Sequence, residues 1–468
     1  MNKKIILGLS LALILALPSF AQKPKYIFYL IGDGMGLNHV NYTEIYQSKL
    51  KNEIGTTPLI FTSFPYATFA TSHSQSNDVT DSAAGGTALA VGKKTKNGVI
   101  SMDSTGTIPH KSIAYAAKEK GMKVGITTSV SIDHATPAAF YANQSTRNKY
   151  YEIANDIKKS NFDFFGGSGF LSPTATYDKK EAENIETVLR NAGYTIVKGR
   201  DEFQKQKDKN KKIILTNDDD SNISSLKFAI DQDSDDLQLA DITQSAIEAL
   251  ESSKNGFFLM VEGGKIDWSS HANDAATTLN EVLDFNKSVQ LAYDFYKKHP
   301  EETLIVVTAD HETGGLGIGN GSSSLKASNL VHQQVSQEQL SKEIGNLRKE
   351  KPNASWEDVK DLLSKNLGLW SKVKVSEQDE DIIKDAYKKS FVDHNNETSK
   401  SLYANDDKIA KLAVTILNKN SSISWASGSH SAAYIPVYAI GVGAETFTSK
   451  LDNIDIPKKI AEVAGLEL

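Results

Sequence analysis

Short apolar runs that alternate with helix-like segments constrain the fold of this chain more than any other feature. The runs have the length and composition of buried strands, and several end in a glycine turn: KYIFYLIGDG, MKVGITTSV, GFFLMVEGG, TLIVVTADH and PVYAIGVG. Helical patterns lie between them, for example at residues 111–121 and 280–299. This alternation predicts a doubly wound α/β fold, in which a largely parallel sheet lies between helical layers.

Acidic residues stand at the ends of three of these predicted strands. Asp33 ends the first strand, Glu262 ends another, and Asp310 follows a third and is itself followed by His311. Ligands of open α/β sheets bind beyond the carboxyl ends of the strands. We therefore expect these polar side chains to meet at one edge of the sheet.

Further candidate metal ligands occur near the same strand ends. In EGGKIDWSSHAND, Asp267 and His271 are four residues apart and share one face of a helix start. His430 lies between small residues ahead of the last predicted strand. Each residue alone is as well explained by an ordinary surface or structural role, but together they indicate a divalent-cation site. The chain has no cysteine, so such a site would use His, Asp and Glu.

The stretch VTDSAAGGTA around Ser82 has two interpretations. It fits a plain helix N-cap, which is the simpler explanation of these residues alone. It also fits a nucleophile at a helix start, where backbone N–H groups attract an anion. Ala83, Ala84, Gly85 and Gly86 would let the backbone approach a metal and a phosphate closely. With the surrounding motifs, we expect Ser82 to be both cap and nucleophile.

The remaining sequence indicates export and a single large domain. Residues 1–21 have two lysines, an apolar core and small residues at the end, which predicts a secretory signal peptide and a periplasmic or secreted protein. Residues 22–468 are expected to be one domain with a mainly helical insertion at 320–422. A polar surface excursion is expected at 201–241, and its middle, KKIILTN, could form a short strand. The insertion could be solvated decoration, a lid or part of a dimer interface. A net charge of −6 without a basic, aromatic-rich stretch excludes a nucleic-acid partner, and no other long apolar run suggests a membrane anchor.

Six motifs occur in an order that resembles alkaline phosphatases of the two-zinc, one-magnesium type: IGDGMG, VTDSAAGGTA, ATPAAFYANQSTR, VEGGKIDWSSH, TADHETGG and SGSH. The resemblance covers nearly all of the mature chain except 201–241 and 320–422. It implies an α/β sandwich, a homodimer, and hydrolysis of phosphate monoesters through a phosphoserine. The products would be inorganic phosphate and an alcohol, and the role would be phosphate scavenging.

Carried over residue by residue, the resemblance also implies a role for each candidate. The first zinc would be held by Asp267, His271 and His430, and the second by Asp33, Asp310 and His311. Magnesium would be held by Asp33, Thr136 and Glu262. These donor types agree with zinc and magnesium chemistry, and two metals ~3.5–4 Å apart can stabilise both oxygens of an in-line displacement.

Two residues would act on the phosphate itself. Ser82 would be the nucleophile and Arg147 would clamp the phosphate oxygens. Arginine is rare in this chain, since only four of the 52 basic residues are arginine. One of them lies in a motif where a planar fork would bind two phosphate oxygens.

Asp81, His134 and Trp268 are expected beside the metals rather than on them. Some family members have Asp and Lys at positions 134 and 268, whereas others share the combination of His134 and Trp268, so the identity of the third metal stays open. His134 either holds a water of magnesium or binds zinc directly. Asp133 is an alternative polar neighbour.

The motifs are also compatible with other functions. Phosphodiesterases, sulfatases and phosphoglycerate mutases have related metal sites, and a secreted phosphate- or zinc-binding protein would belong to another class. The pair Asp81-Ser82, the separate site at Thr136 and Glu262, and Arg147 favour the monoesterase.

Overall fold

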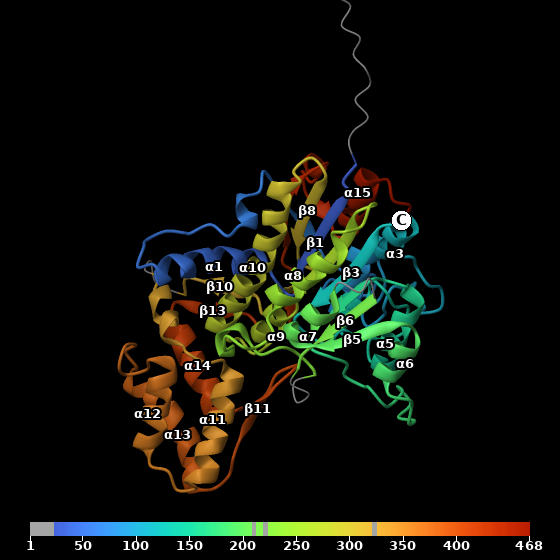
Figure 1. Cartoon of the computed structure of the whole chain (residues 1–468). Helices are drawn as coiled ribbons and strands as arrows, with labels where there is room; N and C mark the ends of the chain where they lie inside the picture. The colour runs from blue at the N-terminus through green and yellow to red at the C-terminus, as the bar shows by residue number, and fades with distance from the viewer. Residues whose placement is uncertain (1–22, 208–211, 219–222, 321–324) are drawn as a thin grey trace, which may run out of the picture.

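The computed structural model describes residues 23–207, 212–218, 223–320 and 325–468. Its main body is a ten-stranded sheet with helices on both faces (Figure 1). The strands lie in the order β16-β2-β15-β8-β1-β7-β3-β4-β6-β5. Their bounds are β1 (Tyr26–Gly32), β2 (Tyr66–Thr71), β3 (Lys123–Thr128), β4 (Phe164–Gly166), β5 (Tyr194–Lys198), β6 (Lys212–Thr216), β7 (Phe257–Gly263), β8 (Thr303–Thr308), β15 (Ile435–Gly441) and β16 (Leu451–Asp452). The predicted signal peptide, residues 1–21, lies outside the described residues.

The helices of the main body are α1 (Leu37–Leu50), α2 (Ser82–Val91), α3 (Ile113–Glu119), α4 (Ala135–Ala138), α5 (Tyr150–Ser160), α6 (Ile185–Asn191), α7 (Gly199–Gln206), α8 (Leu239–Leu250), α9 (Lys265–His271), α10 (Ala275–Lys298) and α15 (Asp455–Ala464). The helices predicted at 111–121 and 280–299 correspond to α3 and α10. Of the helices in the described ranges, none combines the length and apolar composition that crossing a bilayer requires.

Alternating side chains of the central strands face two helical layers. Phe257 of β7 contacts Phe295 of α10 on one face, and Phe258 contacts Phe140, just after α4, on the other. The central strands β1, β7 and β8 are buried along their whole length. The predicted doubly wound α/β fold is confirmed.

Strand β15 runs antiparallel to both of its neighbours, β8 and β2, whereas β1 is parallel to β7 and β8. Val437, near the start of β15, pairs with Thr308 at the end of β8. The residues just before β15 therefore reach the carboxyl edge of the sheet, where the ends of the parallel strands also lie.

The described part of the insertion, residues 325–422, forms a helical lobe at the lower left of Figure 1. It contains α11 (Gln337–Glu350), α12 (Trp356–Leu367), α13 (Glu377–Tyr387) and α14 (Lys408–Asn420). These helices agree with the mainly helical insertion that the sequence predicts. Ser355 and Asp358 form a capping box at the start of α12.

The helical lobe shares a second hydrophobic core with α1 and α10 of the main body. Leu340, Leu363 and Leu417 belong to one buried cluster, which continues into Tyr42 of α1 and Leu279 of α10. The lobe is therefore packed onto the main body through apolar contacts, and solvated decoration does not describe it.

The short strand predicted within KKIILTN, in the middle of 201–241, is confirmed as β6, but it belongs to the main sheet and not to a surface excursion. Ile213, Ile214 and Leu215 are buried in β6, which lies between β4 and β5 in the main sheet. The short apolar run indicated the strand, but its place in the main sheet depends on pairing with β4 and β5.

Small two-stranded sheets complete the fold. They pair β9 (Glu312–Thr313) with β14 (His430–Ser431), β10 (Leu316–Ile318) with β13 (Ile423–Trp425), and β11 (Thr398–Lys400) with β12 (Asn405–Asp407). All three pairs are antiparallel. The first of them brings His430 beside the loop after β8.

Candidate active site

Three buried carboxylates meet at the carboxyl edge of the sheet, as the sequence predicts. Asp33 follows β1, Glu262 lies at the end of β7 and Asp310 follows β8, and these three strands are adjacent. All three residues are fully buried. Three ionisable groups without solvent need a compensating charge, which makes this edge a candidate cation site.

A first group of ligand atoms comes from α9 and β14. Nε2 of His271 lies 3.1 Å from Nε2 of His430 and 3.3 Å from Oδ1 of Asp267. The remaining distance, between His430 Nε2 and Asp267 Oδ1, is 3.5 Å. Tetrahedral zinc with bonds of about 2.0–2.1 Å has ligand atoms about 3.3 Å apart. The three atoms therefore have the spacing of one face of a zinc coordination tetrahedron.

The protons of these two histidines also suit a cation. Nδ1 of His271 lies 2.7 Å from the Gly428 carbonyl oxygen, and Nδ1 of His430 lies 2.8 Å from the Thr80 carbonyl oxygen. A carbonyl oxygen only accepts, so both Nδ1 atoms carry the proton. When the Nε2 atoms are unprotonated, their lone pairs face each other and a carboxylate, an arrangement that a cation between them would stabilise.

A second group consists of Asp33, Asp310 and His311. Nε2 of His311 lies 3.3 Å from Asp33 Oδ1 and 3.3 Å from Asp310 Oδ2. The ligand atoms of these three buried residues all lie within 4.8 Å of one another. They are close enough to bind a single ion.

A third group shares Asp33 with the second. Atoms of Asp33, Glu262 and His134 also lie within 4.8 Å of one another. The Thr136 hydroxyl is 3.4 Å from Oδ2 of Asp33 and 3.4 Å from Oδ2 of Asp310. Both Thr136 and His134 therefore face this group, and the two alternatives for the third metal each have a donor in place.

Several atoms of these groups lack a hydrogen-bond partner in the part of the chain that the structure describes: Asp33 Oδ1, Glu262 Oε1, Asp267 Oδ2 and His134 Nδ1. Buried polar atoms are normally paired. Unpaired buried atoms in these three groups are expected of residues that bind ions.

Burial and mutual repulsion shift the pKa values of the carboxyl groups. Burial, followed by the charges of Asp310 and its neighbours, raises the pKa of Asp33 well above its ordinary value. Burial also raises the pKa of Glu262 to about 8 and that of Asp310 to about 7. Burial disfavours the charge of Asp267 as well, but His271 and other imidazoles hold its pKa well below the ordinary range. Bound cations would remove the repulsion and keep all four groups ionised.

Ser82 opens α2 beside the second group. Its fully buried hydroxyl oxygen lies 3.2 Å from Nε2 of His311. The helix cap, however, is Asp81, whose side chain accepts the Ala84 N–H at 3.0 Å. The expectation that Ser82 caps the helix is therefore wrong. Because Asp81 takes that role, the Ser82 hydroxyl is not used in capping and lies against His311.

The small residues after Ser82 allow the close approach that the sequence indicates. A Cβ atom on Gly85 would lie 2.9 Å from the Asp310 carbonyl oxygen, and one on Gly86 would lie 3.1 Å from the Thr136 Cα. Contacts this short exclude a larger side chain without movement of the backbone. The first turn of α2, with its free N–H groups, is thereby packed against the ligand-bearing loops.

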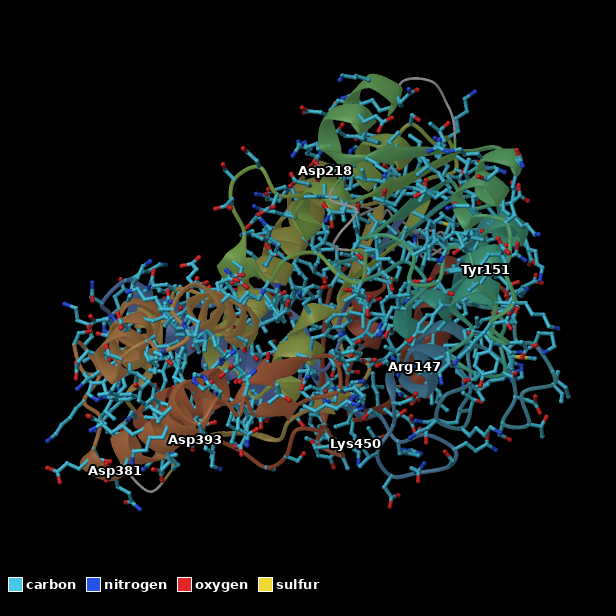
Figure 2. The ribbon with its side chains drawn as sticks, turned by 90° about the horizontal axis from the view of Figure 1, so that it is seen from below. Arg147, Tyr151, Asp218, Asp381, Asp393 and Lys450 are labelled. Carbon is cyan, nitrogen blue, oxygen red and sulfur yellow. The ribbon has the colours of Figure 1, made fainter. Side chains whose placement is uncertain are left out.

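Arg147 follows α4 in the chain and lies beside Asp81. Its Nη1 atom donates to Oδ2 of Asp81 at 3.2 Å, and Nη2 lies 3.3 Å from Nε2 of His134. Burial and the Arg147 charge lower the pKa of His134 to about 3, so this ring is neutral and accepts. Figure 2 labels Arg147 on the main body, far from the tip of the helical lobe that carries Asp381.

Of the other two predicted neighbours, Trp268 lies at the site and Asp133 does not. The ring of Trp268 lies 6.0 Å from that of His134, centroid to centroid, and so forms a wall of the site. Asp133 instead accepts the Leu171 N–H at 2.9 Å and serves the scaffold.

Sequence reasoning missed two residues of the site. Thr313 is fully buried, and its hydroxyl donates to Asp267 at 2.5 Å and lies 3.3 Å from Nδ1 of His311. Its position in TADHETGG, two residues after His311, is a signal that could have identified it. Tyr403, from the helical lobe, stacks on Trp268. No local pattern in the sequence marks Tyr403.

A parallel α/β sheet whose carboxyl edge carries buried carboxylates, imidazoles and a serine at a helix start defines a metal-dependent hydrolase. The family model described as alkaline phosphatase matches residues 24–466. The chain therefore belongs to the alkaline phosphatase family, whose members hydrolyse phosphate monoesters, and it is an enzyme of this type.

Individual relatives agree with the family match. The chain is 34% identical over 444 residues to alkaline phosphatase 4 of Bacillus subtilis. The aligned region covers 92% of this chain and 87% of the relative. Alkaline phosphatase 3 of the same organism is 33% identical, with 93% and 88% covered. Among solved structures, the cold-active alkaline phosphatase of the psychrophile Shewanella sp. has a TM-score of 0.76 at 27% identity, with 94% and 99% covered.

A further similar structure concerns the third metal. It is a histidine-to-glutamate mutant of the alkaline phosphatase from the Antarctic bacterium TAB5 with Mg bound in its M3 site. It has a TM-score of 0.65 at 26% identity and covers 96% of this chain and 100% of that chain.

Proposed function

We propose that Ser82 is the nucleophile of the phosphomonoesterase reaction and that Arg147 binds the phosphoryl group. The Ser82 oxygen would form a bond to phosphorus while the bond from phosphorus to the ester oxygen breaks. The alcohol leaves with a proton, and water then cleaves the phosphoserine to inorganic phosphate. The buried Ser82 hydroxyl beside the second ligand group, at the start of α2, is the observation that carries this proposal.

The metal content that the donor sets support is two zinc ions and one magnesium ion. Asp267, His271 and His430 would hold the first zinc, and Asp33, Asp310 and His311 would hold the second. Asp33, Thr136 and Glu262 would hold magnesium. The nitrogen donors of the first two groups favour zinc, and the all-oxygen set of the third favours magnesium. When bound, such ions lower the pKa of a coordinated hydroxyl and stabilise charge on phosphoryl oxygens.

The other residues at the site would orient these groups. Asp81 holds the Arg147 fork and caps α2, so that one side chain aligns both the clamp and the nucleophile. His134 accepts from Arg147 on one side and faces Asp33 and Glu262 on the other. Trp268 closes the wall next to His134.

A second candidate for the third site is zinc bound directly by His134. It is favoured by the position of a His134 ring nitrogen within 4.8 Å of ligand atoms of Asp33 and Glu262. Imidazole is a better ligand for zinc than for magnesium. Metal titration distinguishes the two candidates.

The predicted signal sequence supports export to the periplasm or medium. Membership of the family supports phosphate scavenging as the role and a homodimer as the assembly. Separation of culture fractions tests export, and light scattering of the purified protein tests the homodimer. A cytoplasmic enzyme or a monomer at assay concentration would contradict them.

The reaction itself is tested by a substrate panel on stripped and reloaded protein. A phosphate monoester, a phosphate diester and a sulfate ester are compared after chelation and after addition of zinc and magnesium. We expect hydrolysis of the monoester to exceed the other two, to vanish on chelation and to return with both metals. Full activity without metals, or preference for the diester, would refute the proposal.

A further inference from the structure

The helical lobe sends one aromatic side chain into the candidate active site. Tyr403 lies in the loop between β11 and β12, and its phenol oxygen is 3.5 Å from Nη2 of Arg147, 256 positions away in the sequence. In Figure 1, β11 runs between the lobe and the main body. A residue of the insertion therefore reaches the proposed phosphate clamp.

The ring of Tyr403 is packed among groups of the site. It stacks on Trp268 with 4.3 Å between ring centroids and an interplanar angle of 11°. It also meets His134 and His271 at angles of 62° and 71°, with centroid distances of 5.8 and 5.5 Å. Stacked and edge-to-face arrangements are the favourable geometries of aromatic pairs. These contacts fix where the phenol oxygen lies.

The loop that carries Tyr403 is itself anchored. The Ser401 N–H donates to the Ala404 carbonyl at 2.8 Å and closes the turn. On the strand that follows, Asp406 accepts from Gln337 of α11 at 2.5 Å, and Asp407 pairs with Arg348 of the same helix. Both aspartates are buried, so these contacts hold the hairpin on α11 rather than leaving it free in solvent.

The guanidinium of Arg147 then has neighbours on three sides. Asp81 accepts from Nη1, while His134 and Tyr403 lie against Nη2. Because a guanidinium only donates, the Tyr403 oxygen must act as the acceptor in this contact. Removing the phenol oxygen would take away one of the three groups that restrict rotation of the fork.

We propose that Tyr403 is a positioning residue for phosphate binding, which acts through Arg147 and makes the helical insertion part of the active site. The inference rests on the proposed function of Arg147. It names a role for the segment 320–422, since the lobe supplies the hairpin from which Tyr403 extends.

A double-mutant cycle on phosphate inhibition tests this role. The inhibition constant for inorganic phosphate is measured with p-nitrophenyl phosphate on the metal-loaded full chain. The four proteins are the wild type, Tyr403→Phe, Arg147→Ala and the double variant. Tyr403→Phe should weaken inhibition about three- to tenfold, the range for one lost hydrogen bond. It should cause no further loss in the Arg147→Ala background.

Controls separate this role from a general structural effect. Tyr403→Phe keeps the ring, so its near-ultraviolet circular dichroism and its bound zinc and magnesium should match the wild type. Tyr403→Ala also removes the stack on Trp268 and should weaken inhibition further. Tyr177→Phe, which removes a hydroxyl from a side chain that is 49% exposed, should leave the inhibition constant unchanged.

Two outcomes would overturn the inference on Tyr403 but leave the proposed role of Arg147 intact, provided that phosphate inhibition is weakened in Arg147→Ala. One is an unchanged inhibition constant in Tyr403→Phe. The other is a loss that persists undiminished in the Arg147→Ala background, because Tyr403 would then contact phosphate directly. An unchanged constant in Arg147→Ala itself would instead refute the proposed clamp, and the inference with it.

Discussion

Replacement of Arg147 by alanine is the sharpest test of the phosphate site. The side chain is 16% exposed, and its fork is already oriented by Asp81 and His134. A charge-assisted hydrogen bond in such a setting contributes about 1.5–3 kcal/mol. The inhibition constant for inorganic phosphate should therefore rise about tenfold to a hundredfold in Arg147→Ala.

The fold should tolerate this change. Asp81 keeps its bonds to the N–H groups of Ala84 and Gly98, both at 3.0 Å. The cap of α2 therefore survives the loss of Arg147, and the thermal unfolding midpoint should shift little. Arg147→Lys keeps the charge but not the fork, and we expect an intermediate inhibition constant.

The assay is competitive inhibition by phosphate during hydrolysis of p-nitrophenyl phosphate, with the bound metals counted in each variant. Arg190→Ala is the matched control, because Arg190 is 50% exposed and pairs with Glu186 on the surface. Its inhibition constant should equal that of the wild type. If Arg147→Ala binds all its metals and is inhibited as strongly as the wild type, Arg147 does not bind phosphate and the reasoning fails.

The remaining predictions concern the nucleophile, the metals and pH. Ser82→Ala should abolish the trapped phosphoenzyme and most turnover while metal content and unfolding temperature stay near wild type; a phosphoenzyme on another residue would contradict this. Metal titration of His134→Ala should still find two bound zinc ions, and the affinity for magnesium should be lower than in the wild type. If the wild type instead binds three zinc ions tightly and His134→Ala loses one of them, His134 is a zinc ligand. Thr313→Val should weaken zinc binding about ten- to a hundredfold in a chelator competition, whereas Thr313→Ser should bind zinc nearly as tightly as the wild type. Equal zinc affinities in the two variants would exclude a role of the Thr313 hydroxyl in zinc binding. In metal-free protein, the folded state raises the pKa of Asp310 to about 7 and that of Glu262 to about 8, so both groups favour the protonated form. Their contribution to the free energy of unfolding is fully present below the unfolded pKa values near 4 and is lost as the pH rises toward 8. The unfolding midpoint of stripped protein should therefore fall between about pH 5 and 8, and zinc with magnesium should remove the dependence; a midpoint that rises over this range would refute it.

Local patterns in the sequence determined the elements and most of the site. The apolar runs around Asp33, Glu262 and Asp310 identified three strands, and the rule for parallel sheets placed their carboxylates at one edge. Both predictions required only the composition of each run and its immediate neighbours. The ordered motifs then identified the family, which the match over residues 24–466 confirms.

Other features depended on contacts between distant segments. His430 reaches the edge because β15 runs antiparallel to β8, and strand direction is set by pairing rather than by the residues of the strand. Asp81 rather than Ser82 caps α2 because backbone geometry at the helix start decides which side chain can reach the Ala84 N–H. β6 is a sheet strand because β4 and β5 bury it.

Tyr403 is the clearest case of a residue that only the tertiary structure could assign. Nothing in SLYAND distinguishes its tyrosine from an exposed one in a polar loop. Its contacts with Trp268 and Arg147 arise because the helical lobe packs on α1 and α10 and returns a hairpin to the main body. The sequence determines which short segments are buried and what chemistry their ends carry, because these depend on neighbouring residues. The tertiary structure decides which distant side chains share the site, because that depends on how the elements pack.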